Sequence, residues 1–170
     1  MRIAQLLALA MLLGSIPFRH LIGRKNAGNA LVVLFDIAKG FVPIYIAKGL
    51  LQSDYWTISI GIVAILSHCF PYWFMFKPNG TAVLPGLGVV LALNPAAGIF
   101  ASAVWGISLL VFRKSFIAVI IAAVSVPILF RMLGTPMAYV IFGLLGMAYI
   151  VIVNVPNIAS NIEGTEPRVR

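Results

Sequence analysis

Long apolar runs, separated by short polar stretches, fill most of this 170-residue sequence. A helix needs about 20 apolar residues to cross the hydrocarbon core of a bilayer. Backbone inside a bilayer must also satisfy its own hydrogen bonds, so such runs predict membrane-spanning helices. The seven runs extend over Ile3 to Phe18, Ala30 to Leu51, Thr57 to Phe76, Ala82 to Leu93, Ala96 to Phe112, Phe116 to Phe130 and Met137 to Val153. We therefore expect an all-α bundle of about seven transmembrane helices.

The connections between the runs are short. Ala82 to Leu93 is the shortest run, so this segment is expected to be tilted, re-entrant or buried among its neighbours, and six spans is the competing count. Asn94-Pro95 and Gly134-Thr135-Pro136 are predicted as helix-to-helix turns. No Ser- or Gly-rich linker is present, so residues 1–170 are predicted to form a single transmembrane domain.

The composition supports a membrane protein and excludes several other classes of protein. Hydrophobic residues make up 62% of the chain and charged residues only 9%, against roughly a quarter in soluble domains. One cysteine cannot form an intrachain disulfide, and two histidines with four acidic residues form no recognisable ligand set, so no metal is expected. The net charge of +8 is spread over several short loops, which favours anionic lipid head groups as partners and not nucleic acid.

The basic residues predict the orientation, because cytoplasmic loops carry an excess of Lys and Arg. With seven spans, one side collects Arg19, Arg24, Lys25, Lys77, Arg113, Lys114, Arg168 and Arg170, and the other collects Arg2, Lys48 and Arg131. This bias predicts a cytoplasmic C-terminus and an N-terminus outside. A signal peptide is the alternative for the first run, but Pro17, Phe18 and the basic cluster after them favour a retained helix.

Four ionisable residues within or beside the apolar runs need an explanation. Asp36 and Lys39 lie deep in the second run, where an unpaired charge costs at least about 2.5 kcal/mol. They share one helix face at i and i+3, so a structural ion pair is favoured over direct catalysis. His68 is a candidate packing residue or general base. Lys77, in a turn that opens the next run, is a candidate phosphate ligand.

Five motifs in order resemble the bacterial acyl-phosphate-dependent glycerol-3-phosphate acyltransferases of the PlsY type. The motifs are Gly14-Ser15-Ile16-Pro17-Phe18, Asp36-Ile37-Ala38-Lys39-Gly40, Ser67-His68-Cys69-Phe70-Pro71 followed by Phe76-Lys77, Leu87-Gly88 through Asn94-Pro95 to Trp105, and Asn157-Ile158 with Gly164-Thr165-Glu166-Pro167-Arg168. The resemblance runs through nearly the whole chain.

This resemblance implies seven helices in the bacterial cytoplasmic (inner) membrane, with an active site on the cytoplasmic side. Such enzymes move an acyl chain from acyl phosphate to glycerol 3-phosphate and form lysophosphatidate without a metal or bound cofactor. Candidate catalytic residues, if the chain is active, are His68 and Lys77. The candidate substrate- and phosphate-binding residues are Arg24, Asn29, Lys77, Asn157 and Arg168.

The chain departs from the family pattern in both phosphate-handling loops. The polar loop that follows the family's first helix is missing, because Arg24 runs almost directly into Lys25-Asn26-Ala27-Gly28. In the second loop, Pro78-Asn79-Gly80-Thr81 replaces the family's Gly-Gly-Lys-Gly, so Gly80 stands where a second lysine is expected. Lys77 retains the first basic position.

A third departure lies near the C-terminus, where the family has a histidine and this chain has Asn154. Losing one charged partner at a phosphate site removes several kcal/mol of transition-state stabilisation, and about 1.4 kcal/mol is a tenfold change in rate. The favoured hypothesis is a chain that has lost catalysis and serves as a structural or lipid-binding accessory subunit of a membrane complex. The alternative is an active acyltransferase that uses acyl phosphate and glycerol 3-phosphate.

Overall fold

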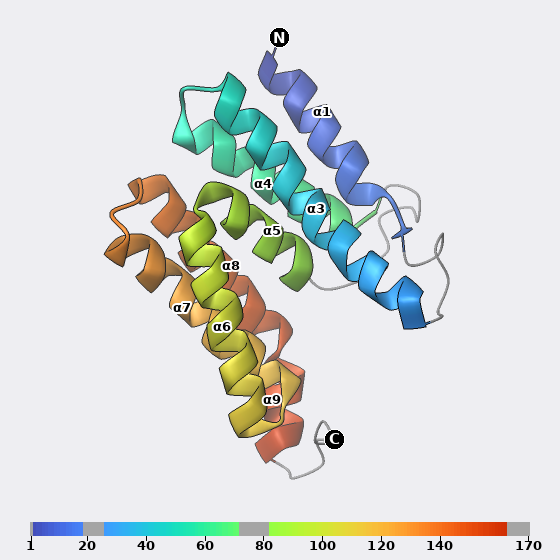
Figure 1. The fold of residues 1–170 in the computed structure, drawn as a ribbon, viewed down its shortest axis with the longest axis vertical. Helices are drawn as coiled ribbons and strands as arrows, with labels where there is room; N and C mark the ends of the chain where they lie inside the picture. The colour runs from blue at the N-terminus through green and yellow to red at the C-terminus, as the bar shows by residue number, and fades with distance from the viewer. Residues whose placement is uncertain (1, 19–25, 72–81, 163–170) are drawn as a thin grey trace. The chain divides into compact units, whose positions relative to one another are not determined.

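The computed structural model describes residues 2–18, 26–71 and 82–162, and all regular structure within them is helical (Figure 1). The helices are α1 (Arg2–Ser15), α3 (Asn26–Leu50), α4 (Asp54–Cys69), α5 (Val83–Leu93), α6 (Pro95–Phe112), α7 (Ser115–Met132), α8 (Met137–Val153) and α9 (Val155–Ile162). Each of the seven apolar runs overlaps one helix, in order α1, α3, α4, α5, α6, α7 and α8, which confirms the all-α expectation.

The helices differ in length and in apolar composition. Three segments of the described part are long and apolar enough to cross a membrane, namely Ala30–Leu50 within α3 and the whole of α6 and α7. Helix α1 ends at Ser15, two residues before Pro17, whose ring disfavours helical backbone in the residue before it. Helix α4 ends at Cys69, so the predicted run to Phe76 is too long as a helix, and residues 72–81 lie outside the described part.

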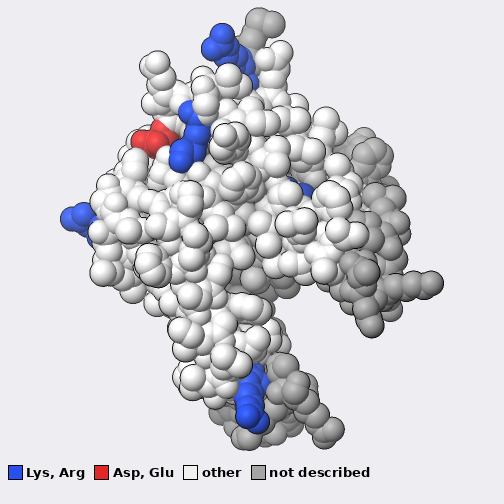
Figure 2. Space-filling model, viewed as in Figure 1, with Lys and Arg blue, Asp and Glu red and all other residues white. Residues whose placement is uncertain are grey.

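The helices group into two compact units, Met1–Leu93 and Asn94–Arg170. Each is described by itself, and the expectation of one transmembrane domain over residues 1–170 stays a prediction. The described Lys and Arg side chains form separate small groups on the face drawn in Figure 2, and most of that face is uncharged. Such a surface suits a hydrocarbon environment.

In the first unit, α1 packs chiefly on α4. Leu6 and Ala10 share a core with Ile60 and Ala64, and the Ser15 hydroxyl donates to the Ser67 carbonyl oxygen over 3.5 Å. The two helices therefore run in the same direction and end beside each other. The C-terminal ends of α1 and α4, which come before residues 19–25 and 72–81, therefore lie at the same end of this unit.

Helices α3 and α5 form the closest backbone approach of the first unit. A Cβ on Gly40 would overlap the Pro85 carbonyl group, and a Cβ on Gly88 would overlap the Ile37 carbonyl group. Gly40 lies against the backbone of α5, and Gly88 lies against the backbone of α3 at the same crossing. Because each glycine has no side chain, the backbone of the other helix can approach it closely. Small residues allow such close helix contacts in membranes.

Helix α5 has its C-terminus held by a lysine. With 11 residues it is about 16 Å long, roughly half the hydrocarbon thickness. The Lys48 ammonium donates to the carbonyl oxygens of Ala92 (3.1 Å) and Leu93 (2.9 Å). A cation at this end satisfies unpaired carbonyl groups and complements the helix dipole.

The second unit begins where sequence analysis placed a turn. The Asn94 side-chain oxygen accepts a hydrogen bond from the Ala97 amide (3.0 Å), and Pro95 occupies the first helical turn of α6. The other predicted turn joins α7 to α8, where Gly134 adopts a φ of 64° and the Thr135 hydroxyl donates to the Phe130 carbonyl. Both turn predictions are confirmed.

Candidate functional site

A buried ion pair is the centre of the candidate site. The Lys39 Nζ atom lies 2.7 Å from the Asp36 Oδ1 atom, as the i, i+3 spacing on one helical face allows. Asp36 is 7% exposed and Lys39 5% exposed. Charges buried to this degree need partners, so this pair supplies the compensation that an apolar environment requires.

His68 joins this pair from another helix. Its Nδ1 atom lies 3.3 Å from Lys39 Nζ and 3.8 Å from Asp36 Oδ1. Helix α4 delivers His68 from its last turn, next to the Ser67 carbonyl that contacts the end of α1. Parallel packing of α1 on α4 and the contacts of α3 with both therefore bring residues 29 positions apart together.

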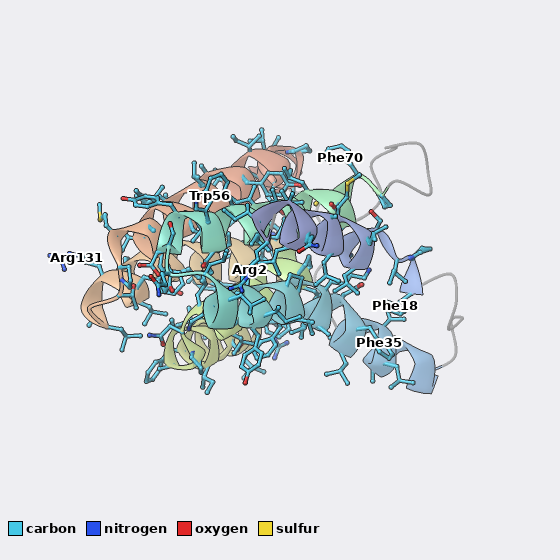
Figure 3. All side chains as sticks on the ribbon, turned by 90° about the horizontal axis from the view of Figure 1, so that it is seen from above. Arg2, Phe18, Phe35, Trp56, Phe70 and Arg131 are labelled. Carbon is cyan, nitrogen blue, oxygen red and sulfur yellow. The ribbon has the colours of Figure 1, made fainter. Side chains whose placement is uncertain are left out.

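Two phenylalanines lie against the charged cluster. The Lys39 ammonium lies 5.1 Å from the centre of the Phe18 ring, within the range of a cation–π contact. The Phe18 and Phe35 rings stack with their centres 4.5 Å apart, and Figure 3 shows them beside each other, Phe18 just after α1 and Phe35 within α3. The aromatic face reduces the exposure of the lysine and stabilises its charge.

The sequence alone predicted neither of these associations. It placed Asp36 with Lys39 on one face, but it gave no sign that His68 lies against them or that Phe18 covers the lysine. The only signal available was that Phe18, Lys39 and His68 each belong to a family motif. Spacing along one chain cannot show which faces of two helices meet.

The other candidate binding residues are not part of this cluster as far as the structure describes them. Arg24, Lys77 and Arg168 lie outside the described residues, and Asn29 belongs to α3 with its side chain outside the description. Asn157 lies in the second unit, on α9, and its amide donates to the Asn154 side-chain oxygen over 3.0 Å. The structure therefore brings together Asp36, Lys39 and His68 alone among the predicted site residues that it describes.

Asn154, where the family resemblance led us to expect a histidine, connects α8 to α9. Its side-chain amide donates to the Ile150 carbonyl (2.8 Å), and its own carbonyl accepts the Ile158 amide (3.0 Å). These bonds tie the end of one helix to the start of the next. Within the described ranges, no group of three or more His, Cys, Asp or Glu side chains is placed to hold a metal ion.

An apolar helical exterior around a buried ionic cluster defines an integral membrane protein with a polar site inside the helix packing. The family follows from comparison with known sequences. The profile of the glycerol-3-phosphate acyltransferases matches residues 24–164, and the chain belongs to this family.

Individual relatives agree with this assignment. The glycerol-3-phosphate acyltransferase of Gloeobacter violaceus is 30% identical, with 95% of this chain and 92% of the relative aligned. That of Bordetella petrii is 31% identical, with 98% and 92% aligned. The crystal structure of PlsY (YgiH), an integral membrane glycerol 3-phosphate acyltransferase, in its lysophosphatidic acid form matches with a TM-score of 0.85, 28% identity and coverage of 99% of this chain and 95% of that one. Its glycerol 3-phosphate form matches equally well, at 27% identity.

The alignment with the Gloeobacter relative also measures a difference in length. It extends over 190 positions, whereas this chain has 170 residues, so at least 20 aligned positions have no counterpart here.

Proposed function

We propose that this chain is a membrane protein of the acyltransferase family that has lost acyl transfer and serves as a lipid-binding or structural accessory subunit of a membrane complex. It is expected to cross the bacterial cytoplasmic membrane seven times, with its C-terminus in the cytoplasm. Its partners are membrane lipids and further membrane-protein subunits.

The observation that carries this proposal is the concurrent loss of groups for binding two phosphates. Against the motifs that the family resemblance leads us to expect, Gly80 stands in place of a lysine, Asn154 stands in place of a histidine, and the polar loop after the first helix is missing. Removing one transition-state hydrogen-bond donor lowers kcat about 10²- to 10³-fold. Three concurrent losses are expected to leave little catalysis. The bonds from Asn154 to Ile150 support a structural use of that position.

The test is a direct assay of the purified full chain in phospholipid nanodiscs. With acyl phosphate and glycerol 3-phosphate, the expected result is no phosphate release or lysophosphatidate above nanodiscs without protein. The Gloeobacter relative, prepared in the same way, is the positive control. Turnover that requires both substrates and falls on Lys77→Ala would overturn the proposal.

An active acyltransferase is the second candidate, and the buried cluster favours it. Asp36, Lys39 and His68 all belong to family motifs, and buried ionic groups are costly to keep where hydrophobic residues would pack as well. A chain under no demand for a polar site would be expected to lose them. Turnover abolished by His68→Ala, in protein that keeps its helical circular dichroism, would support this candidate.

The accessory role has a test of its own. Gentle detergent extraction from native membranes should recover the chain in a stoichiometric complex with other membrane proteins, and native mass spectrometry should find phospholipid bound to it. Recovery as a free chain without bound lipid would contradict the accessory role, whatever the activity assay gives.

A further inference from the structure

The turn between α6 and α7 contains an arginine in a costly backbone conformation. Arg113 has a φ of 53°, in the left-handed region, and among the residues that the structure describes it is the only one besides glycine with a positive φ. Its amide donates to the Leu109 carbonyl oxygen over 2.9 Å at the end of α6. Glycine is the usual residue at such a helix end, because a Cβ in this conformation is crowded by the following carbonyl oxygen. An arginine here costs stability that glycine would not, so we expect its side chain to have a use.

The second unit, as far as the structure describes it, contains no acidic side chain for Arg113. Residues 94–162 include neither Asp nor Glu, and the Arg113 side chain is exposed. Lys114 follows directly, so the whole connection between α6 and α7 is basic. An anionic partner of the Arg113 guanidinium must therefore come from outside these residues.

An exposed apolar band, formed by Leu110, Val111 and Phe112, lies directly before this basic turn. Leu110 is 79% exposed and Val111 67%, and three consecutive helical residues point to three different sides. The end of α8 adds the exposed Ile152, because α6, α7 and α8 pack in turn with short connections and α6 and α8 end at the same end of this unit (Figure 1). Apolar side chains on every side of a helix end, followed by cations, are typical of the boundary between lipid tails and head groups.

We propose that Arg113 binds the phosphate of an anionic phospholipid, whose acyl chains lie against the apolar band. A guanidinium can donate two parallel hydrogen bonds to a phosphate group, which a lysine ammonium cannot do in the same geometry. This contact offsets the cost of the left-handed arginine. The inference deepens the lipid-binding part of the proposed function and rests on it only for the placement of this unit in a bilayer.

Thermal unfolding of the purified full chain in uncharged detergent micelles tests the contact. Added phosphatidylglycerol should raise the unfolding midpoint, because a ligand that binds the folded state stabilises it, and phosphatidylcholine should raise it much less. Arg113→Gln should need about fivefold more phosphatidylglycerol for the same rise, as expected for the loss of one basic residue at an anionic lipid surface. An equal response to the two lipids, or an unchanged response of Arg113→Gln, would overturn the proposal.

Arg131→Gln is the matched control, because Arg131 is exposed in the last turn of α7, at the other end of that helix. It should keep the wild-type response to phosphatidylglycerol. An equal loss in this variant would show a general attraction between cations and anionic lipid, with no contact assigned to Arg113. Inorganic phosphate should leave the midpoint unchanged, and a rise equal to that with phosphatidylglycerol would assign the turn to a free anion and contradict a lipid site.

Arg113→Gly separates lipid binding from a structural role of the side chain. Without charged lipid, this variant should unfold at a higher temperature than the wild type, because glycine adopts the left-handed conformation without strain. With phosphatidylglycerol it should respond as weakly as Arg113→Gln. A glycine variant less stable than the wild type without lipid would show that the arginine stabilises the chain itself, and the proposal would fail. These readouts need neither turnover nor a partner subunit, so they stand apart from the acyl-transfer and complex-recovery tests.

Discussion

At the scale of single residues, the buried pair of Asp36 and Lys39 is the feature most sensitive to substitution. Breaking a buried ion pair by removing one partner costs about 3–5 kcal/mol, because the other charge is left uncompensated. Asp36→Asn is therefore expected to destabilise the first unit by about 3 kcal/mol, because Lys39 would keep only His68 and the Phe18 ring as neighbours and no anionic partner. The double variant Asp36→Asn/Lys39→Met should recover part of this loss, since it removes both charges.

Chemical unfolding in detergent micelles, followed by circular dichroism, measures these differences. Arg131→Met is the matched control, because this arginine is exposed in the last turn of α7, and its effect should stay within about 0.5 kcal/mol. A double variant less stable than Asp36→Asn would show that the lysine stem packs in a way that outweighs its charge.

At the scale of helices, the crossing of α3 and α5 decides how closely the first unit packs. Gly88→Ala would place a methyl group against the Ile37 carbonyl, and rigid backbone cannot yield as a flexible side chain does. Overpacking of this kind costs about 1–3 kcal/mol. Gly88→Ala should lower the unfolding midpoint in micelles accordingly.

Gly86→Ala on the same helix is the control for this crossing. A Cβ there meets no atom within 4 Å, and alanine favours helix over glycine by up to about 1 kcal/mol. Gly86→Ala should therefore be neutral or stabilising. Equal losses of stability in the two variants would show that helix propensity, and not the crossing, controls this segment.

The C-terminus of α5 depends on a single side chain. Lys48→Met removes two hydrogen bonds to the carbonyls of Ala92 and Leu93. A buried hydrogen bond to a charged group contributes about 1.5–3 kcal/mol to stability, and the exposure of Lys48 lowers this contribution. We expect a loss of about 1–2 kcal/mol and faster hydrogen exchange in the last turn of α5. Lys48→Arg keeps a cationic donor and should exchange like the wild type, and a Lys48→Met variant with unchanged exchange would contradict the cap.

At the scale of the whole molecule, the number of spans and their direction decide where the candidate site faces. Cys69 is the only cysteine, so Cys69→Ala gives a background for single-cysteine labelling in intact cells. Gln52→Cys and Arg113→Cys place a thiol at two exposed positions between helices. With seven spans, a membrane-impermeant maleimide should label Gln52→Cys at once and Arg113→Cys only after permeabilisation.

This labelling experiment tests most directly whether helix α5 crosses the membrane. If Val83–Leu93 does not cross, six spans remain and positions 52 and 113 lie on the same side of the membrane. Labelling of both thiols in intact cells would therefore support the six-span count. Labelling of Arg113→Cys alone would reverse the predicted orientation.

Helix existence was largely predictable because its causes are local, whereas some ends differ: the run predicted to Phe18 ends as a helix at Ser15, and the run predicted from Ala30 begins as a helix at Asn26. Apolar runs between breakers give helices, Pro17 ends α1, and Asn94 with Pro95 begins α6 through a side-chain cap. The run that ends at Phe76 was predicted too long, because hydrophobicity continues past Cys69 although the described helix does not. Apolar character alone does not mark where a helix stops.

The sequence by itself determined the class of this protein: its apolar runs require helices in lipid, and its ordered motifs identify the family. The tertiary structure alone decided which polar residues meet. His68 reaches Lys39 through the direction in which α3 and α4 pack, and Gly40 with Gly88 sets the distance between α3 and α5. A helical face is readable from residue spacing, whereas its partner depends on the shape and contacts of a second helix far away in the chain.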